Sequence, residues 1–156
     1  MTGIENAGAN SYVLLQLGKR RFALQADIVA ELAPPVRLHT IPHTSQLVAG
    51  VIVRRGHIVP VYDAAPVVGG KSSLSHRFYL IARREFEGET ELSAIPVNGE
   101  CELATGEIQP PQPDRPTCIT GTLVVGEESF DVLDFEKLVT SQPDDANEIA
   151  RAEARQ

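Results

Sequence analysis

The chain is divided into many short apolar runs, and none of them is long enough for an extended helix. The runs recur roughly every 8–12 residues and are separated by glycine, proline or charged turns. Pro34 and Pro35 exclude a long helix around them, and no stretch alternates a strand pattern with a long helical pattern. This spacing favours small β-barrels over a layered α/β fold.

Two pairs of runs predict hairpins from their turn chemistry. YVLLQL (12–17) leads through Gly18-Lys19 into RFALQ (21–25), and VAGVIV (48–53) leads through a doubled arginine and a glycine into HIVPVY (57–62). Such short glycine-containing connections are typical of tight β-hairpins. A proline inside the last of these runs predicts a sheet edge or a bulge at Pro60.

Alternation along each run predicts which side chains face the core. The first half of the chain is expected to supply the first barrel, with inward residues among Leu15, Leu17, Phe22, Leu24, Val51, Val53, Val59 and Val61. The second half is expected to supply the second barrel or the junction, with inward residues Tyr79, Ile81, Ile95, Leu123, Val125, Phe130 and Val132.

Composition and charge exclude several classes of protein. The net charge of -7 repels nucleic acid, and the basic clusters at 19–21, 54–55 and 83–84 end strand-like runs, as solvated charges commonly do. No apolar run approaches the roughly 18 residues that span a bilayer, and residues 1–10 lack the features of a signal peptide. We therefore expect a cytoplasmic protein that neither inserts directly into a membrane nor binds nucleic acid.

No catalytic constellation stands out. The GGKS segment at 69–72 resembles only the end of a phosphate-binding loop, and no long helix follows it. His39 and His43 have helical ligand spacing, but Pro42 lies between them, and nothing around Cys118 resembles a nucleophile elbow. We expect no enzymatic activity, no cofactor, no metal, and two buried, reduced cysteines. A small metal-binding barrel that uses His39, His43 and Cys118 is the alternative.

Residues 50–63, GVIVRRGHIVPVYD, resemble the signature hairpin of the CheW-like coupling proteins of bacterial chemotaxis, which has the form G-V-x-x-x-R-G-x-x-x-P-V-x-D. The opening YVLLQLGKRRFALQ is similar to the first strands of that family, and Val29 and Glu31 match the V-x-E motif that follows. ITGTLVVGEESFDVLDFEKLV resembles the closing strand, turn, strand and helix. The resemblance extends from Tyr12 to Val139.

The resemblance implies a mainly β fold, in which two SH3-like five-stranded β-barrel subdomains with short helical turns pack around a shared core. We expect a flexible N-terminus at 1–11, a CheW-like domain of two intertwined barrels at 12–140, and a polar, loosely held tail at 141–156. It further implies a non-catalytic adaptor at receptor arrays on the inner face of the membrane. Such an adaptor couples the cytoplasmic tip of a methyl-accepting chemoreceptor to the regulatory domain of a CheA-type histidine kinase. An adaptor of the same fold in a pilus-motility or other chemosensory-like pathway is the alternative.

The residues that the resemblance implies for receptor or kinase binding are Arg55, Gly56, Glu31 and Val29. Glycine permits the turn, and an adjacent guanidinium offers planar, multiple hydrogen-bond donors. Glu31 is expected to pair with Arg55 and to orient it beside the receptor groove. Because neighbouring strand residues face opposite sides, Arg54 is expected to point to the other face and to have no such role.

Overall fold

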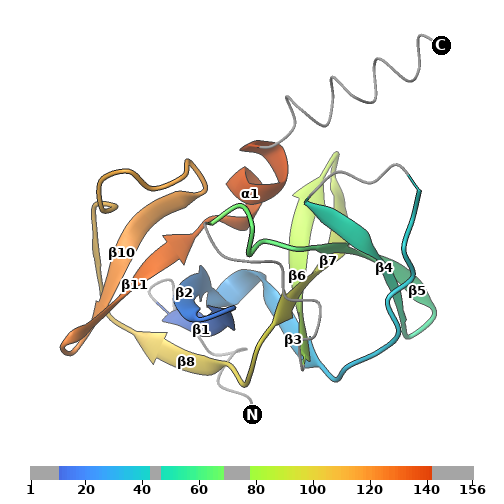
Figure 1. The fold of residues 1–156 in the computed structure, drawn as a ribbon, viewed down its shortest axis with the longest axis horizontal. Helices are drawn as coiled ribbons and strands as arrows, with labels where there is room; N and C mark the ends of the chain where they lie inside the picture. The colour runs from blue at the N-terminus through green and yellow to red at the C-terminus, as the bar shows by residue number, and fades with distance from the viewer. Residues whose placement is uncertain (1–10, 43–46, 69–77, 142–156) are drawn as a thin grey trace, which may run out of the picture.

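The computed structural model describes residues 11–42, 47–68 and 78–141, in which eleven strands form two sheets that lie side by side (Figure 1). The first, here called the terminal sheet, has the order β8-β1-β2-β11-β10-β9, with β1 (Ser11–Leu17), β2 (Arg20–Gln25), β8 (Glu102–Thr105), β9 (Glu107–Gln109), β10 (Ile119–Val125) and β11 (Glu128–Leu133). The second, the middle sheet, has the order β3-β6-β7-β5-β4, with β3 (Val29–Ala33), β4 (Val48–Arg54), β5 (His57–Tyr62), β6 (Phe78–Phe86) and β7 (Glu89–Val97). The predictions made for residues 1–10, for His43, for the GGKS segment and for 142–156 lie outside the described residues.

The terminal sheet closes on itself through one kinked strand. Its two edge strands, β8 and β9, are consecutive in the chain and are separated only by Gly106. A Cβ atom at Gly106 would lie 2.2 Å from the carbonyl oxygen of Val124, so this close approach of two backbones requires glycine. If β8 and β9 count as one strand, this barrel has the predicted five.

The middle sheet closes in a similar way. Its edge strands are β3 and β4, and the chain that leaves β3 returns to pair with β4. The backbone N–H of His39 donates to the carbonyl of Val51 at 2.8 Å, and the N–H of Val51 donates to the carbonyl of His39 at 2.9 Å. A Cβ atom at Gly50, where φ is 154°, would lie 2.3 Å from that His39 oxygen. The predicted fold class, two β-barrel subdomains, is confirmed.

The assignment of strands to barrels was wrong. The two N-terminal strands pair with the C-terminal strands: β2 runs parallel to β11, with Phe22 opposite Asp131 and Ala23 opposite Val132. Strands β3 to β7 form the middle barrel by themselves. Hairpin turns determine only which neighbouring strands pair, whereas a parallel pairing over such a long separation depends on which apolar faces can be buried together.

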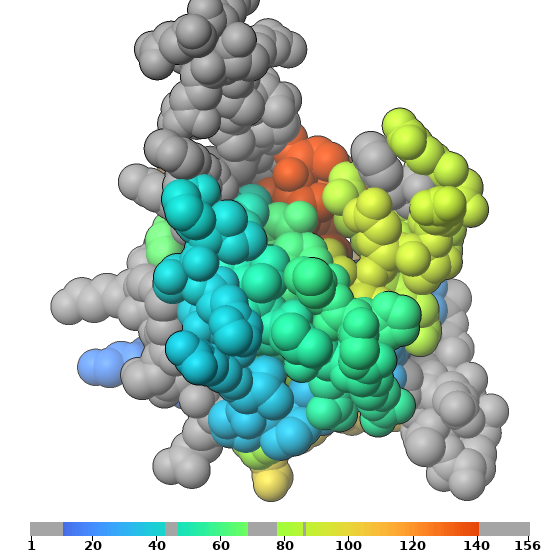
Figure 2. All heavy atoms as spheres, turned by 90° about the vertical axis from the view of Figure 1, so that its right-hand side faces the viewer, coloured from blue at the N-terminus to red at the C-terminus, as the bar shows by residue number. Residues whose placement is uncertain are grey.

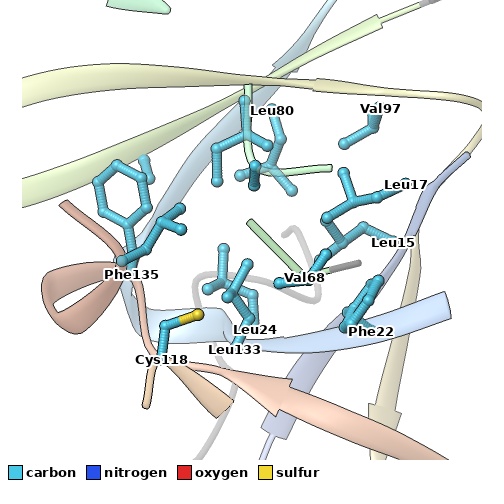
Figure 3. Close-up of a cluster of buried hydrophobic side chains, with 14 of the residues drawn as sticks. Leu15, Leu17, Phe22, Leu24, Val68, Leu80, Val97, Cys118, Leu133 and Phe135 are labelled. Atoms are coloured by element: carbon cyan, nitrogen blue, oxygen red, sulfur yellow. The ribbon is translucent and has the colours of Figure 1, made fainter. Parts of the chain in front are cut away.

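Three clusters of buried side chains fill the described part of the protein. One lies within each barrel, and the largest lies at the junction, where both sheets, the segment 64–68 and α1 (Phe135–Ser141) contribute to a shared core (Figure 3). Strand β1 is buried on both faces: Val13, Leu15 and Leu17 point to the junction, and Tyr12 and Leu14 point into the terminal barrel. This explains why the β1 sequence is a nearly continuous apolar run.

One short helical element connects the two sheets in the described part of the chain, and a second follows the last strand. The 3-10 turn η1 (Ala26–Ile28) leads directly into β3, and the predicted C-terminal helical turn is α1. Asp134 caps α1, since its Oδ1 accepts a hydrogen bond from the N–H of Lys137 at 3.0 Å. Phe135 and Leu138 on this helix are buried in the junction cluster, so α1 is held by packing although it has only 7 residues.

Most of the predicted inward side chains are buried, and the exceptions on β4 have a common physical cause. Val53 is exposed and Val51 half-buried, while Ile52 is the buried apolar residue of β4. Val125 is also half-buried, but it packs against the cluster of the terminal barrel. Three successive β-branched residues do not reveal which of them faces inward. The cross-strand partner decides, because Ile52 lies opposite the buried Val59.

The sheet edge predicted at Pro60 is wrong, because β5 lies between β4 and β7. Val51, its partner on β4, directs both of its backbone polar groups to His39, so β4 requires no donor from Pro60. On the other side, the pairing of β5 with β7 is confined to one position, Val61 opposite Ala94. The register shift between β4 and β5 lies elsewhere, in β4 between Val48 and Gly50, so the bulge predicted at Pro60 is not observed.

Candidate protein-interaction site

The β4–β5 hairpin ends in a two-residue turn whose backbone is left-handed at both positions. Arg54 pairs with His57, and between them Arg55 has φ 51° and Gly56 has φ 81°. These values are those of a type I′ turn, which favours Asn, Asp or Gly at its first position. An arginine there is disfavoured by about 1 kcal/mol or more, so this side chain is held in a conformation that local preferences oppose.

Both arginines reach the same carboxylate. Arg54 donates from Nε and Nη2 to Oε1 of Glu31, at 2.9 Å and 2.5 Å, and Nη2 of Arg55 lies 3.7 Å from the other oxygen, Oε2. The expected separation of the two arginines onto opposite faces is wrong, because Arg55 belongs to the turn and strand alternation does not apply to it. The closest partner of Glu31 is Arg54, although Arg54 was expected to have no such role.

The ion pair between Glu31 and Arg54 joins the two edge strands of the middle sheet. Glu31 lies on β3 and Arg54 at the end of β4, and these two strands are the opposite edges of the middle sheet. The pair therefore bridges the seam where the barrel closes. Arg54 and Glu31 are both half-buried, whereas the Arg55 side chain is 73% exposed and free to meet a partner.

Exposed apolar side chains lie beside these charges. Val53 and Ile58 face each other across the hairpin on its outer side, with exposed fractions of 53% and 71%. Figure 2 faces this part of the molecule, where β4 and β5 (green) lie between the segment after β3 (cyan) and the β6–β7 hairpin (yellow-green). We call Glu31, Arg54, Arg55, Val53 and Ile58 the hairpin surface.

The other predicted site residues have clear positions. Gly56 lies in the exposed turn, and a Cβ atom there would meet nothing within 4 Å, so the left-handed backbone alone explains the glycine. Val29 is only 2% exposed and packs in the junction cluster. Its side chain therefore supports β3 from inside and is not available to a partner.

A groove of about 640 Å³ lies where the two barrels meet. Its walls come from β1, β2, η1, β6, β9, β10, β11 and α1, and its floor includes the buried Leu133 and Phe135. Ile108 contributes an exposed apolar side chain. None of the three charged residues of the hairpin surface lines this junction groove, so the two features are separate.

The charged rim of the junction groove is held by bonds between the barrels. Arg84 of β6 donates from Nε and Nη2 to the two carboxylate oxygens of Glu136 on α1, at 2.9 Å and 3.3 Å. This hydrogen bonding raises the pKa of Arg84, so its guanidinium stays charged. Arg83 donates from Nη2 to the carbonyl of Asp27 at 3.0 Å. These bonds orient positive and negative groups along the groove.

The described residues give no support to a metal centre. Within 11–42, 47–68 and 78–141, no three His, Cys, Asp or Glu side chains are grouped as metal ligands would be. Cys118 is buried in the junction cluster, while His39 lies on the segment that pairs with β4. Burial raises the pKa of the Cys118 thiol, and that of Cys101 to about 11. Both thiols therefore stay protonated at neutral pH, opposite to what a nucleophile or a metal ligand requires.

Comparison with known proteins identifies the family. A family model described as CheW-like domain matches residues 11–142. The chain belongs to the CheW-like domain family. This CheW-like domain is also similar in structure to the scaffolding protein TtCheW from Thermoanaerobacter tengcongensis, with a TM-score of 0.70 and 22% sequence identity over 84% of this chain and 92% of that one. No curated protein matches the sequence. In the described part of this CheW-like domain, no helix has the length and apolar character to cross a membrane.

Proposed function

We propose that this CheW-like domain is a non-catalytic adaptor, located in the cytoplasm, that couples the cytoplasmic tip of a chemoreceptor to a CheA-type histidine kinase. The observation that carries the proposal is the presence of two separate surfaces suited to protein partners. The hairpin surface and the junction groove share no residue, so one adaptor can contact two proteins at once.

The hairpin surface has the composition of a protein interface. The exposed pair Val53 and Ile58 supplies apolar area, and an arginine is among the residues that most often dominate binding energy. Glu31 and Arg54 form a fixed support against which Arg55 can be oriented. We assign this surface to the regulatory domain of the kinase.

The junction groove suits the receptor tip. A groove of this kind can take a partner helix through apolar anchors, while charges along the rim set its orientation. Ile28 and Ile108 are the apolar groups toward solvent, and Arg84 with Glu136 offers both signs of charge at the rim. A modest, transient interface between two proteins is expected to have a Kd of about micromolar.

Three matched substitutions test this assignment. Ile58→Glu is expected to weaken binding of the kinase regulatory domain by at least about tenfold and to leave receptor-tip binding unchanged, and Ile108→Glu is expected to do the reverse. Leu103→Glu is the control, because Leu103 is as exposed as Ile108 (44% and 43%) and belongs to neither surface. Titration calorimetry with each purified fragment provides the affinities.

Two results would contradict the proposal in different ways. If the wild-type chain binds neither fragment at about 100 µM, the adaptor role is wrong. If both substitutions weaken the same partner, the adaptor role stands and the division of the two surfaces is wrong.

A further inference from the structure

A second hollow, of about 300 Å³, opens on the terminal barrel and is lined only by polar residues. It shares no lining residue with the junction groove. Its lining, here called the arginine hollow, comes from β2, β10, β11 and the segment between β9 and β10, and consists of Arg20, Arg21, Gln112, Arg115, Thr122, Ser129 and Asp131. Three guanidinium groups in one hollow are notable in a chain whose net charge is -7.

One buried carboxylate orients two of the three arginines. Asp131, with a side chain only 9% exposed, accepts on Oδ2 from Nη2 of Arg20 at 3.1 Å and from Nε of Arg115 at 2.8 Å. Arg20 also donates from Nη1 to the carbonyl of Val68 at 2.5 Å. Arg115 uses only Nε in this way, and its two Nη groups have no partner among the described residues. A single carboxylate therefore faces two guanidiniums with donors to spare.

Arg21 adds a third positive charge that is only weakly engaged. Its guanidinium lies over the ring of Phe130, 4.8 Å from the ring centre. Its carboxylate partners are Glu128 at 3.3 Å and Glu102 at 3.8 Å, and both of these side chains are well exposed. Exposed pairs of this kind contribute about 0–1 kcal/mol, so Arg21 can exchange them for a stronger anionic partner.

The segment that carries Arg115 is stiffened by its sequence. Residues 110–116, PPQPDRP, contain four prolines, each of which fixes a backbone angle. The Oγ1 of Thr122 donates to the carbonyl of Pro110 at 3.1 Å and ties this segment to β10. The donors of the hollow are thus arranged in advance, which lowers the entropy lost when an anion binds.

We infer that the arginine hollow binds a phosphate group carried by a small metabolite. Guanidiniums match phosphate oxygens with paired, charge-assisted hydrogen bonds, and the hydroxyl of Ser129 and the amide of Gln112 add neutral donors. The volume is at the low end for a ligand pocket, and the lining offers no apolar wall to a nucleobase, since Arg21 covers the face of Phe130. The ligand is therefore a compact phosphate ester or diphosphate rather than a nucleotide.

The chain of 156 residues can be titrated with inorganic phosphate and with pyrophosphate while NMR follows the arginine Nε–H signals at constant ionic strength. Saturable shifts of the Arg20, Arg21 and Arg115 signals are expected, with pyrophosphate binding more tightly than phosphate. Arg115→Gln is expected to weaken binding by at least about tenfold, because it removes a guanidinium whose two Nη groups are uncommitted in the described part of the chain. The variant is expected to fold, because Arg20 continues to hold Asp131. Arg37→Gln is the control: it removes the same charge from an exposed residue outside the hollow.

Shifts that fail to saturate at about 20 mM of either anion would overturn the inference, since that Kd corresponds to no built site. Equal weakening in Arg37→Gln and Arg115→Gln would also overturn it, because it would show a response to net charge alone. If Arg115→Gln does not fold, Arg21→Gln decides, since the ion pairs of Arg21 are exposed and their loss leaves the fold intact. The inference does not depend on the adaptor function.

Discussion

Replacing Arg55 by Asn separates the function of the guanidinium from the stability of the turn. Asn-Gly is a preferred pair for a type I′ turn, and Arg55 and Gly56 have φ 51° and 81°. The substitution removes a side chain that is 73% exposed while giving the backbone a residue that tolerates the left-handed region. We expect the protein to remain fully folded and to lose affinity for the kinase regulatory domain.

The two contributions to stability have opposite signs and can be compared. Asn relieves about 0.5–1 kcal/mol of left-handed strain. The lost ion pair, at 3.7 Å and largely exposed, contributes about 0–0.5 kcal/mol, and Glu31 keeps its shorter bonds to Arg54. The net change is between zero and a gain of about 1 kcal/mol, which raises Tm by about 0–5 °C in a domain of this size.

The β6–β7 hairpin supplies a matched control. Its turn has Glu87 and Gly88 at φ 52° and 80°, nearly the same backbone as at Arg55 and Gly56. Glu87→Asn is therefore expected to raise Tm by a similar amount without reducing kinase binding. Thermal denaturation and a reconstituted kinase assay are measured on both variants. If Arg55→Asn activates the kinase as fully as the wild type, the role of the guanidinium is refuted. If its free energy of unfolding falls by more than about 2 kcal/mol, the account of the turn is refuted.

Other predictions follow from single contacts. Arg54→Ala removes both hydrogen bonds across the barrel seam to Glu31, and urea denaturation is expected to show a loss of about 1 kcal/mol; no change would mean that the pair is not a structural support. Gly50→Ala places a Cβ atom 2.3 Å from the carbonyl oxygen of His39, so a loss of at least about 2 kcal/mol or failure to fold is expected, and wild-type Tm would contradict the close approach. Because the pKa of Cys101 is raised to about 11, its reaction with a thiol reagent at pH 8 is expected to be about 100-fold slower than in the urea-unfolded chain and to accelerate as pH rises toward 11. A native rate equal to the unfolded rate would show that the thiol is exposed.

Local structure followed from the sequence because its causes are local. Gly18, with φ 67°, makes the turn between β1 and β2, and Leu17 lies opposite Arg20. The same reasoning gave the β4–β5 hairpin, and the family resemblance gave the C-terminal helix. The family resemblance added the pair of barrels and the contact between Glu31 and Arg55, which no pattern in the chain could supply by itself.

The phase of β4 was within reach of the sequence, but it was missed. A two-residue turn places Val53 opposite Ile58 and Ile52 opposite Val59. Side chains directly opposite each other lie on the same face, so an inward Val59 requires an inward Ile52 and an outward Val53. The exposed apolar pair of the hairpin surface, Val53 and Ile58, follows from that register.

Only the tertiary structure decided how the pieces combine. The pairing of β2 with β11, the partnership of Arg54 with Glu31 across the barrel seam, and the meeting of Arg20, Arg115 and Asp131 in one hollow join residues far apart in the chain. The sequence by itself determined the strands, the turns and most of the buried residues, since these depend on neighbours within a few positions. Which edges close a barrel, and which charges then face one another, depends on burying apolar faces from distant segments together, and that choice is made by the whole chain.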